Sequence, residues 1–232
     1  MREPPPRSNS DVTVAAAPRT TTEASSLTLV ARSSSHFSRI ARIYVAELDV
    51  PCVFQPVYDI NSTDAALFGD NPLLRVPSLR TPAGIWFGSL NVCRELARRS
   101  ERRARLVWPE DLVQPLGANA QEIVTDAMGT GVVIITARLT KVADDSPVLT
   151  KPFARLVGAL DWLEAHLEAA LDTQPACDVS FLEVSAFCLL THLEFRGLGT
   201  LDAHPRLRAF CARVAERDSS RATPYRFDQP PG

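Results

Sequence analysis

The stretch NPLLRVPSL, residues 71–79, decides the fold of this 232-residue chain. Its Val76–Pro77 bond lies between an Asn-Pro turn and a short run of strand-forming residues. An X-Pro bond adopts the cis form at a cost of only about 0.5 to 1 kcal/mol, and the context predicts a cis-proline here. That geometry turns the backbone N–H and C=O of Val76 outward. We therefore expect this loop to pair with an extended peptide.

Working outward from this loop, the segments before and after it alternate between strand and helix patterns. A hairpin is expected around the turn-rich tetrapeptide 81–84, and Ser89 opens a helix in the motif FGSLNVCREL, residues 87–96. The order is βαβ followed by ββα, which predicts a small mixed sheet with helices on its faces. We thus expect a thioredoxin-like α/β domain over residues 27–100, with strands near 27–30, 52–57, 76–80 and 85–87, helices near 41–48 and 89–99, and a short helix near 63–68.

The sequence pattern beyond residue 100 predicts helices. A linker over 101–114 is followed by an all-α domain over 115–225, with helices expected at 118–141, along the apolar stripe 153–171, from Ser180 to Phe195 and from Pro205 onward. Ser180 and Glu183 have the spacing of a capping box, and Pro205 suits a first helical turn. The segment 1–26 is rich in Pro, Ser, Thr and Ala, and this composition predicts a disordered tail. We expect a second tail over residues 226–232.

The composition and charge of the chain limit the kinds of partner that we expect it to bind. The hydrophobic content is 45% and the formal net charge is -2, which gives no electrostatic reason to expect a nucleic acid or an anionic membrane as partner. No apolar run approaches the roughly 18 residues of a membrane span. The five cysteines are widely spaced and form no CxxC pair, which predicts reduced thiols, no metal site and a cytoplasmic location. The arginine cluster after residue 97 is interpreted as a solvated linker face.

The segment SSSHFSRIAR, residues 33–42, places hydroxyls where the first helix begins. A helix start presents free N–H groups and about half a positive charge, so an anion such as a thiolate is stabilised there. Lowering a free thiol by two pKa units needs roughly 2.7 kcal/mol, which one charged hydrogen bond plus a helix terminus can supply. Alternatively, these serines only cap the helix, which is the commonest role of serine at this position.

Five segments in this order resemble cytosolic glutathione transferases over about residues 27–225. SSSHFSRIAR resembles the serine-containing SPxSPFxRxVR segment of bacterial-like members, and NPLLRVPSL resembles NPxGKVPxL. FGSLNVCREL resembles ESxAIxxYL, WPEDL at 108–112 resembles YPxD, and HPRLRAFCARVAER at 204–217 resembles the start of the family's last long helix. The resemblance implies glutathione as co-substrate, its conjugation to a small-molecule electrophile in detoxification, and a homodimer.

Carried over residue by residue, the resemblance assigns five roles. Ser35 aligns with the hydroxyl that activates the thiol, with Ser33, Ser34 and Ser38 as neighbouring candidates. Val76 pairs its backbone with the cysteinyl part of glutathione, and Pro77 fixes the bend. Ser89 holds the γ-glutamyl carboxylate, and Arg75 stands at the family's usual Lys or Arg. In the family, one helix of the helical domain lines the electrophile pocket. The resemblance places Thr125, Met128 and Thr130 of this chain on that helix.

Three departures from the family pattern bear on function. Gly88 replaces the acid that accepts from the γ-glutamyl ammonium, and a second subunit is one source of a substitute, through Glu122 or Asp126. Leu74 replaces a glycine. His36 replaces a proline, and we interpret it as a partly exposed neighbour of the helix cap without a catalytic role.

These departures leave two other functions open. One is a non-catalytic member of the same fold that acts as a binding or assembly module. The other is a glutathione-dependent isomerase, because the serine run after Arg32 also resembles the zeta class.

Overall fold

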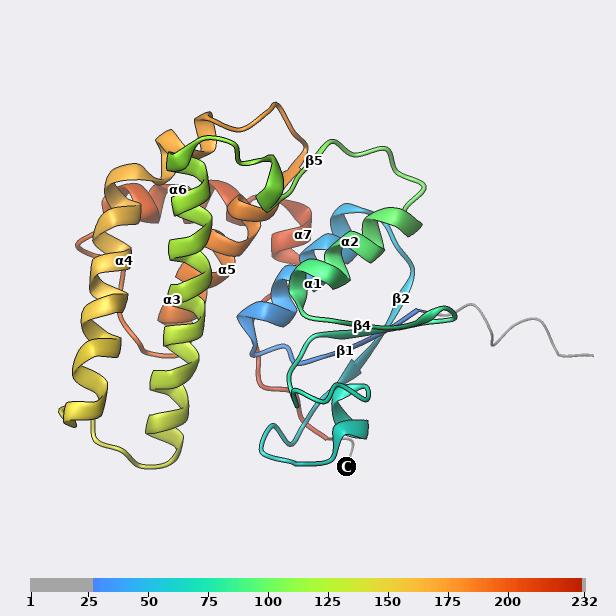
Figure 1. The fold of residues 1–232 in the computed structure, drawn as a ribbon, viewed down its shortest axis with the longest axis horizontal. Helices are drawn as coiled ribbons and strands as arrows, with labels where there is room; N and C mark the ends of the chain where they lie inside the picture. Colours follow the sequence, from blue (N-terminus) through green and yellow to red (C-terminus); the bar gives the residue numbers. More distant parts are fainter. Residues whose placement is uncertain (1–26, 231–232) are drawn as a thin grey trace, which may run out of the picture.

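The computed structural model describes residues 27–230; the predicted tail at 1–26 lies outside the described residues. Its first part is a four-stranded sheet with the order β2-β1-β3-β4. β1 (Leu27–Ala31) pairs parallel with β2 (Cys52–Pro56) and antiparallel with β3 (Ser78–Thr81), which forms a hairpin with β4 (Gly84–Phe87). Two helices, α1 (His36–Glu47) and α2 (Ser89–Arg99), pack together against the sheet (Figure 1). This is the thioredoxin-like arrangement that the sequence predicts.

The second part is helical. Two long antiparallel helices, α3 (Pro115–Leu139) and α4 (Pro147–Asp172), form its outer layer, and α5 (Phe181–Phe195) runs through its centre (Figure 1). α6 (Pro205–Ala215) and the short α7 (Asp218–Arg221) follow. The predicted N-cap of α5 is present, because the Ser180 hydroxyl accepts a hydrogen bond from the Glu183 N–H. The fold class is therefore the predicted one, an α/β domain followed by an all-α one.

The 3-10 turn η1 (Ala65–Phe68) lies where the sequence predicts a short helix. Other small elements escape the sequence patterns, among them the 3-10 turn η2 (Pro109–Asp111) within the linker. The linker also contains β5 (Leu106–Val107), which pairs in parallel with β6 (Val179–Ser180) just before α5. Pro152 lies inside α4 rather than breaking it. No helix in residues 27–230 is long and apolar enough to cross a membrane.

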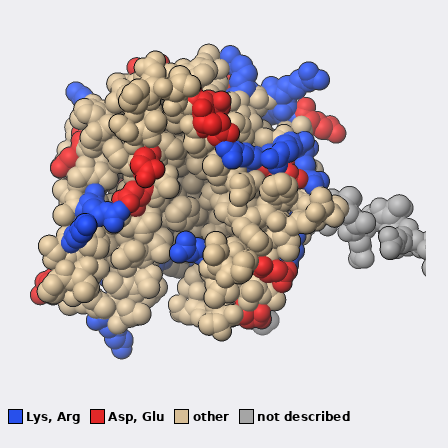
Figure 2. Space-filling view, viewed as in Figure 1, with Lys and Arg blue, Asp and Glu red and all other residues tan. Residues whose placement is uncertain are grey.

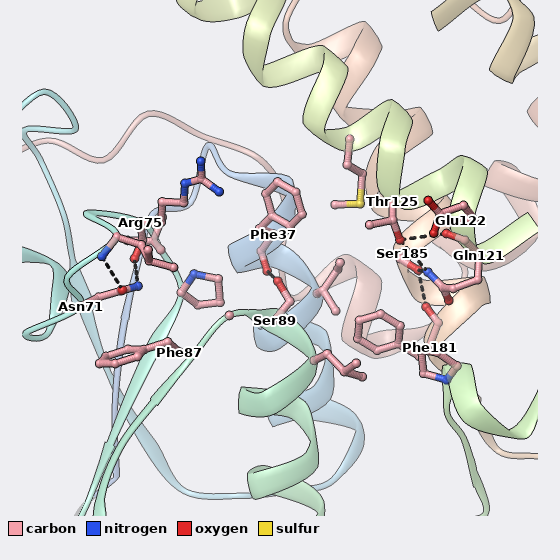
Figure 3. Close-up of a pocket in the computed structure, with 18 residues that line it drawn as sticks. Phe37, Asn71, Arg75, Phe87, Ser89, Gln121, Glu122, Thr125, Phe181 and Ser185 are labelled. Atoms are coloured by element: carbon pink, nitrogen blue, oxygen red, sulfur yellow. Dashed lines mark hydrogen bonds between the residues drawn. The ribbon is translucent and has the colours of Figure 1, made fainter. Parts of the chain in front are cut away.

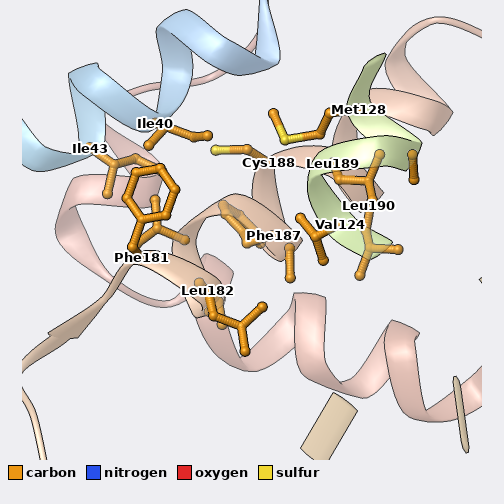
Figure 4. Close-up of a cluster of buried hydrophobic side chains, with 14 of the residues drawn as sticks. Ile40, Ile43, Val124, Met128, Phe181, Leu182, Phe187, Cys188, Leu189 and Leu190 are labelled. Atoms are coloured by element: carbon orange, nitrogen blue, oxygen red, sulfur yellow. The ribbon is translucent and has the colours of Figure 1, made fainter. Parts of the chain in front are cut away.

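One hydrophobic core joins the two parts of the molecule. Side chains from α1, α3 and α5 meet in it (Figure 4). Ile40 and Tyr44 of α1 are fully buried, as are Val124 of α3 and Phe187 of α5. Burial of one such side chain stabilises the fold by about 1.5 to 3 kcal/mol. This shared core holds the helical part against the face of the α/β domain and so fixes the two walls of the cavity described next.

Polar contacts at the ends of the chain reinforce the junction. Arg217 pairs with Glu47 of α1 and with Glu183 of α5, at N–O distances of 2.9 and 2.7 Å. After α7 the chain runs back across α1, and the hydroxyl of Tyr225 donates to the carbonyl of Cys188 at 2.6 Å. The residues that follow α7 are therefore attached to both parts of the molecule at defined points.

Candidate functional site

A cavity of about 490 Å³ opens between the α/β domain and the helices. The space-filling view shows a hollow there, with charges of both signs scattered over the surrounding face (Figure 2). Residues of the loop before β3, of the start of α2 and of α1 form one wall, and residues of α3 and α5 form the opposite wall (Figure 3). Most of the lining is apolar, as is usual for small-molecule sites. Its charged members are Arg75 and Glu122.

The loop before β3 presents free backbone to this cavity. The Val76–Pro77 bond is cis, which confirms the prediction. Asn71 shapes the loop, because its amide donates to the carbonyl of Arg75 at 2.8 Å and its side-chain oxygen accepts from the N–H of Leu73 at 3.0 Å. Within residues 27–230 neither the N–H nor the C=O of Val76 has a hydrogen-bond partner. Both groups remain available to a ligand with an extended backbone.

Leu74 occupies the position of this loop at which the glutathione transferase pattern has a glycine. Its φ is +52°, in the left-handed region where a side chain costs roughly 1 to 2 kcal/mol. The side chain packs against the small cluster of Val30, Val57 and Phe68 beneath the loop, and this burial offsets part of that cost. The loop thus keeps its shape without the glycine.

The start of α2 forms the next part of the same wall. Gly88 is the N-cap and has φ +81°, and no side chain caps the helix. The first N–H groups of a helix have no partner within it, so this end of α2 is an electropositive site for a carboxylate. Ser89 lines the cavity, and its hydroxyl donates to the carbonyl of Phe37 at 3.0 Å. Space for a side chain exists at Gly88, where an added Cβ would meet nothing within 4 Å.

The serines before α1 lie differently from Ser89. Ser35 is the N-cap of α1, and its hydroxyl accepts from the N–H of Ser38 at 3.3 Å. Phe37 and Ile40 of the segment 33–42 line the cavity, and Ser35 does not. Ser33 is completely buried, its hydroxyl has no partner, and its N–H donates to the carboxylate of Asp228 at 2.7 Å. Of the five predicted site residues, the structure thus brings Arg75, Val76, Pro77 and Ser89 together on one wall and leaves Ser35 beside it.

His36 is one of two histidines buried between α1 and α5. It is 1% exposed, so the expectation of a partly exposed neighbour of the cap was wrong. Its Nδ1 lies 2.8 Å from Nδ1 of His192, and Nε2 of His192 lies 3.0 Å from the carbonyl of Ser34. A carbonyl only accepts, so Nε2 of His192 carries the proton and its Nδ1 accepts from His36. The hydrogen bond between the rings therefore needs His192, the acceptor, to be neutral.

Burial sets the protonation of this pair. Burial lowers the pKa of His36 well below its usual value, and the neighbouring His192 and Arg196 lower it further. Burial also lowers the pKa of His192, to about 4, although its hydrogen bond to Ser34 acts in the opposite direction. Sequence reasoning missed this contact because the two residues are 156 positions apart. A histidine within an otherwise apolar helix is the one signal that points to it.

The helical wall supplies the remaining polar groups. Thr125 and Met128 line the cavity as the family resemblance suggests, whereas Thr130 does not. Asp126 forms an ion pair with Arg155. Glu122 lines the cavity of its own chain and forms no ion pair within residues 27–230. Sequence reasoning missed Gln121, Phe181 and Ser185, which face the cavity from the same wall (Figure 3).

Comparisons with known proteins agree with this geometry. Residues 29–104 match the family model described as the N-terminal domain of glutathione S-transferase. No curated protein matches the chain.

Many solved structures share the fold. One is a glutathione transferase family member from Pseudomonas fluorescens Pf-5 with bound glutathione, at 23% identity and a TM-score of 0.69, covering 87% of this chain and 100% of that chain. Another is a glutathione S-transferase from Methylobacterium radiotolerans in complex with glutathione sulfonate, at 19% identity and a TM-score of 0.69, covering 89% and 98%. The family match therefore covers the α/β domain, and the solved structures share the fold over most of the chain.

Proposed function

We propose that this protein binds glutathione along the wall formed by Val76 and Ser89 and conjugates it, through attack of its thiolate, to an electrophilic small molecule. One observation carries the proposal, namely the free N–H and C=O of Val76 on the wall of a cavity shared by both domains. A cysteinyl residue in extended conformation would pair with both groups. The structural relatives from P. fluorescens and M. radiotolerans hold glutathione or its sulfonate, which supports the same ligand class here.

The charges of the cavity suit the two ends of glutathione. The γ-glutamyl carboxylate would accept from the free N–H groups at the start of α2 and from the region of Ser89. Arg75, which forms no ion pair within the described residues, would pair with a carboxylate of the tripeptide. Gly88 offers nothing to the γ-glutamyl ammonium, and a missing charged hydrogen bond costs about 1.5 to 3 kcal/mol, or roughly 10 to 150-fold in affinity.

Ionisation of the thiol is assigned to the start of α1. The Ser35 hydroxyl accepts from Ser38, which leaves its own proton free to donate to a thiolate. The positive end of the α1 dipole acts in the same direction. The electrophile would then lie against Phe37, Met128 and Phe181, an apolar surface at the other side of the sulfur.

The experiment compares glutathione affinity by calorimetry and conjugation of a chlorodinitrobenzene by absorbance for the wild type and Ser35→Ala. We expect millimolar or tighter binding and a loss of conjugation of at least tenfold in the variant, with little change in affinity. The matched control is Ser146→Ala, which alters the N-cap serine of α4, a cap without a side-chain hydrogen bond. Unaltered conjugation by Ser35→Ala would move the role to Ser33, Ser34 or Ser38.

A second function is a non-catalytic binding module of the same fold. Two observations favour this binding module. Ser35 is absent from the residues that line the cavity, and Gly88 stands where the family pattern has an acidic residue. Absence of glutathione binding in the same titration would support it against the transferase. A glutathione-dependent isomerase is the third function, and a substrate panel separates it because isomerisation consumes no glutathione.

A further inference from the structure

A second cavity, of about 240 Å³, lies on the opposite side of α1 from the transferase site. It is bounded by α1, by the strands β1 and β2, and by the chain that follows α7. No residue lines both this cavity and the interdomain one. Its lining combines apolar side chains with two guanidinium groups: Leu29, Arg42, Val45, Cys52, Phe54, Ala222, Thr223 and Arg226.

Arg42 is a half-buried cation without a counter-ion. Its guanidinium donates to the carbonyl of Pro224 at 3.3 Å and lies over the ring of Phe54, 5.6 Å from its centre. Within residues 27–230 no carboxylate forms a salt bridge with it. A guanidinium has five N–H donors, so most of them are unused. Burying a charge in this state is unfavourable unless an anion compensates it.

Arg226 brings a second positive charge to the same cavity. Its only carboxylate neighbour among the described residues is Asp228, at 3.7 Å, and that carboxylate already accepts from the N–H of Ser33. Burial lowers the pKa of Arg42, and the charges of Arg226 and Arg39 lower it further, whereas Asp228 and Cys188 act in the opposite direction. Two guanidinium groups with spare donors therefore line one small concave space in which positive charge is in excess.

We propose that this cavity binds a small aromatic carboxylate, held between the guanidinium groups of Arg42 and Arg226 with its ring against Phe54 and Val45. Arginine forks match a planar carboxylate in two parallel hydrogen bonds. The volume is below the roughly 300 to 1,000 Å³ of sites for drug-sized ligands, which suits a single-ring molecule. The apolar walls contributed by Leu29 and Phe54 favour an organic acid over inorganic phosphate.

The location gives this binding a structural consequence. Residues 222–226 form one side of the cavity, and two residues further on Asp228 holds the N–H of Ser33 beside α1. A carboxylate that bridges Arg42 and Arg226 would fasten the C-terminal segment to α1. Amide hydrogens in the segment 222–228 are then expected to exchange more slowly when the ligand is bound.

The test uses benzoate as probe and the full-length protein. Calorimetry is expected to give one saturable site, and Arg42→Gln and Arg226→Gln are each expected to weaken it by at least about tenfold. Arg103→Gln, which alters an arginine of the linker outside the cavity, and Arg75→Gln, which alters the interdomain cavity, are the matched controls and should bind benzoate as the wild type does. Circular dichroism checks that Arg42→Gln is folded, and Arg226→Gln changes a side chain that is 64% exposed and should fold normally.

Three results would overturn the proposal. Absence of saturable benzoate binding by the wild type rejects the site. Equal binding by Arg226→Gln and the wild type, or loss of binding in Arg75→Gln, assigns benzoate to another place. Benzyl alcohol or inorganic phosphate binding as tightly as benzoate rejects the ligand class, because the first lacks the charge and the second lacks the ring.

Discussion

Gly88 is the residue at which this chain departs most from the glutathione transferase pattern that its sequence resembles, and its backbone conformation determines what a replacement can do. Its φ of +81° and ψ of 151° lie in a region of backbone conformation that glycine adopts almost exclusively. The space around it is open. A carboxylate can therefore be restored at the start of α2 only at a cost in stability of about 1 to 3 kcal/mol.

We predict that Gly88→Asp raises glutathione affinity by about tenfold or more, because a carboxylate beside Ser89 accepts from the γ-glutamyl ammonium. Gly88→Asn is the matched control, since it carries the same backbone cost and lacks the charge. Titration calorimetry measures both. Equal affinity of the two variants would show that the γ-glutamyl ammonium does not reach this position.

At the scale of elements, the pair His36 and His192 links the start of α1 to the end of α5. Both rings are buried, the hydrogen bond between them needs His192 to be neutral, and their neighbourhood contains Arg39 and Arg196. The folded state therefore lowers both pKa values relative to the unfolded chain, where a histidine titrates near 6.5. The contribution to stability is complete above pH 6.5 and is lost as the pH falls toward 4.

We predict that the free energy of unfolding decreases between pH 6.5 and 4, with about 3 kcal/mol arising from His192 alone. Urea unfolding at a series of pH values measures this. His192→Gln should be less stable than the wild type at pH 7.5 and should show a smaller loss on acidification. His166→Gln, which alters a histidine that packs on Trp162 away from the pair, should keep the pH dependence of the wild type; an equal loss in His192→Gln would contradict the assignment.

At the scale of the whole molecule, α3 and α4 form the outer layer of the helical part (Figure 1). Three of their valines, Val132, Val133 and Val157, are 42%, 53% and 56% exposed. Exposed apolar groups on adjacent helices are typical of an association surface. They support the homodimer that the family resemblance implies, which we propose to form through this layer.

We predict that the wild type is a dimer in solution and that Val133→Asp or Val157→Asp weakens association by a hundredfold or more, because each leaves an unpaired charge in the interface. Light scattering after size exclusion measures the mass. Val53→Asp is the matched control, since Val53 is equally exposed on β2, at the edge of the sheet. A wild-type monomer would reject the proposal, and dimeric Val133→Asp and Val157→Asp would move the interface elsewhere.

The sequence by itself determined the features that depend on local chemistry. Proline and hydroxyl residues act on their immediate neighbours, so the cis bond before Pro77, the Ser180 cap and the start of α6 at Pro205 could be predicted from short motifs. The alternation of strand and helix patterns was enough for the fold class. Four of the five predicted site residues lie on one wall because the loop before β3 and the start of α2 adjoin in the hairpin topology.

Only the tertiary structure decided the features that depend on contacts between distant segments. Spacing could not reveal that Phe37 rather than Ser35 faces the cavity, because the packing of α1 against α5 sets its rotation. Residues more than 150 positions apart meet in three places: in the contact between His36 and His192, in the hydrogen bond from Ser33 to Asp228, and in the cavity lined by Arg42 and Arg226. Such contacts arise from the burial of one shared core, which no local pattern encodes.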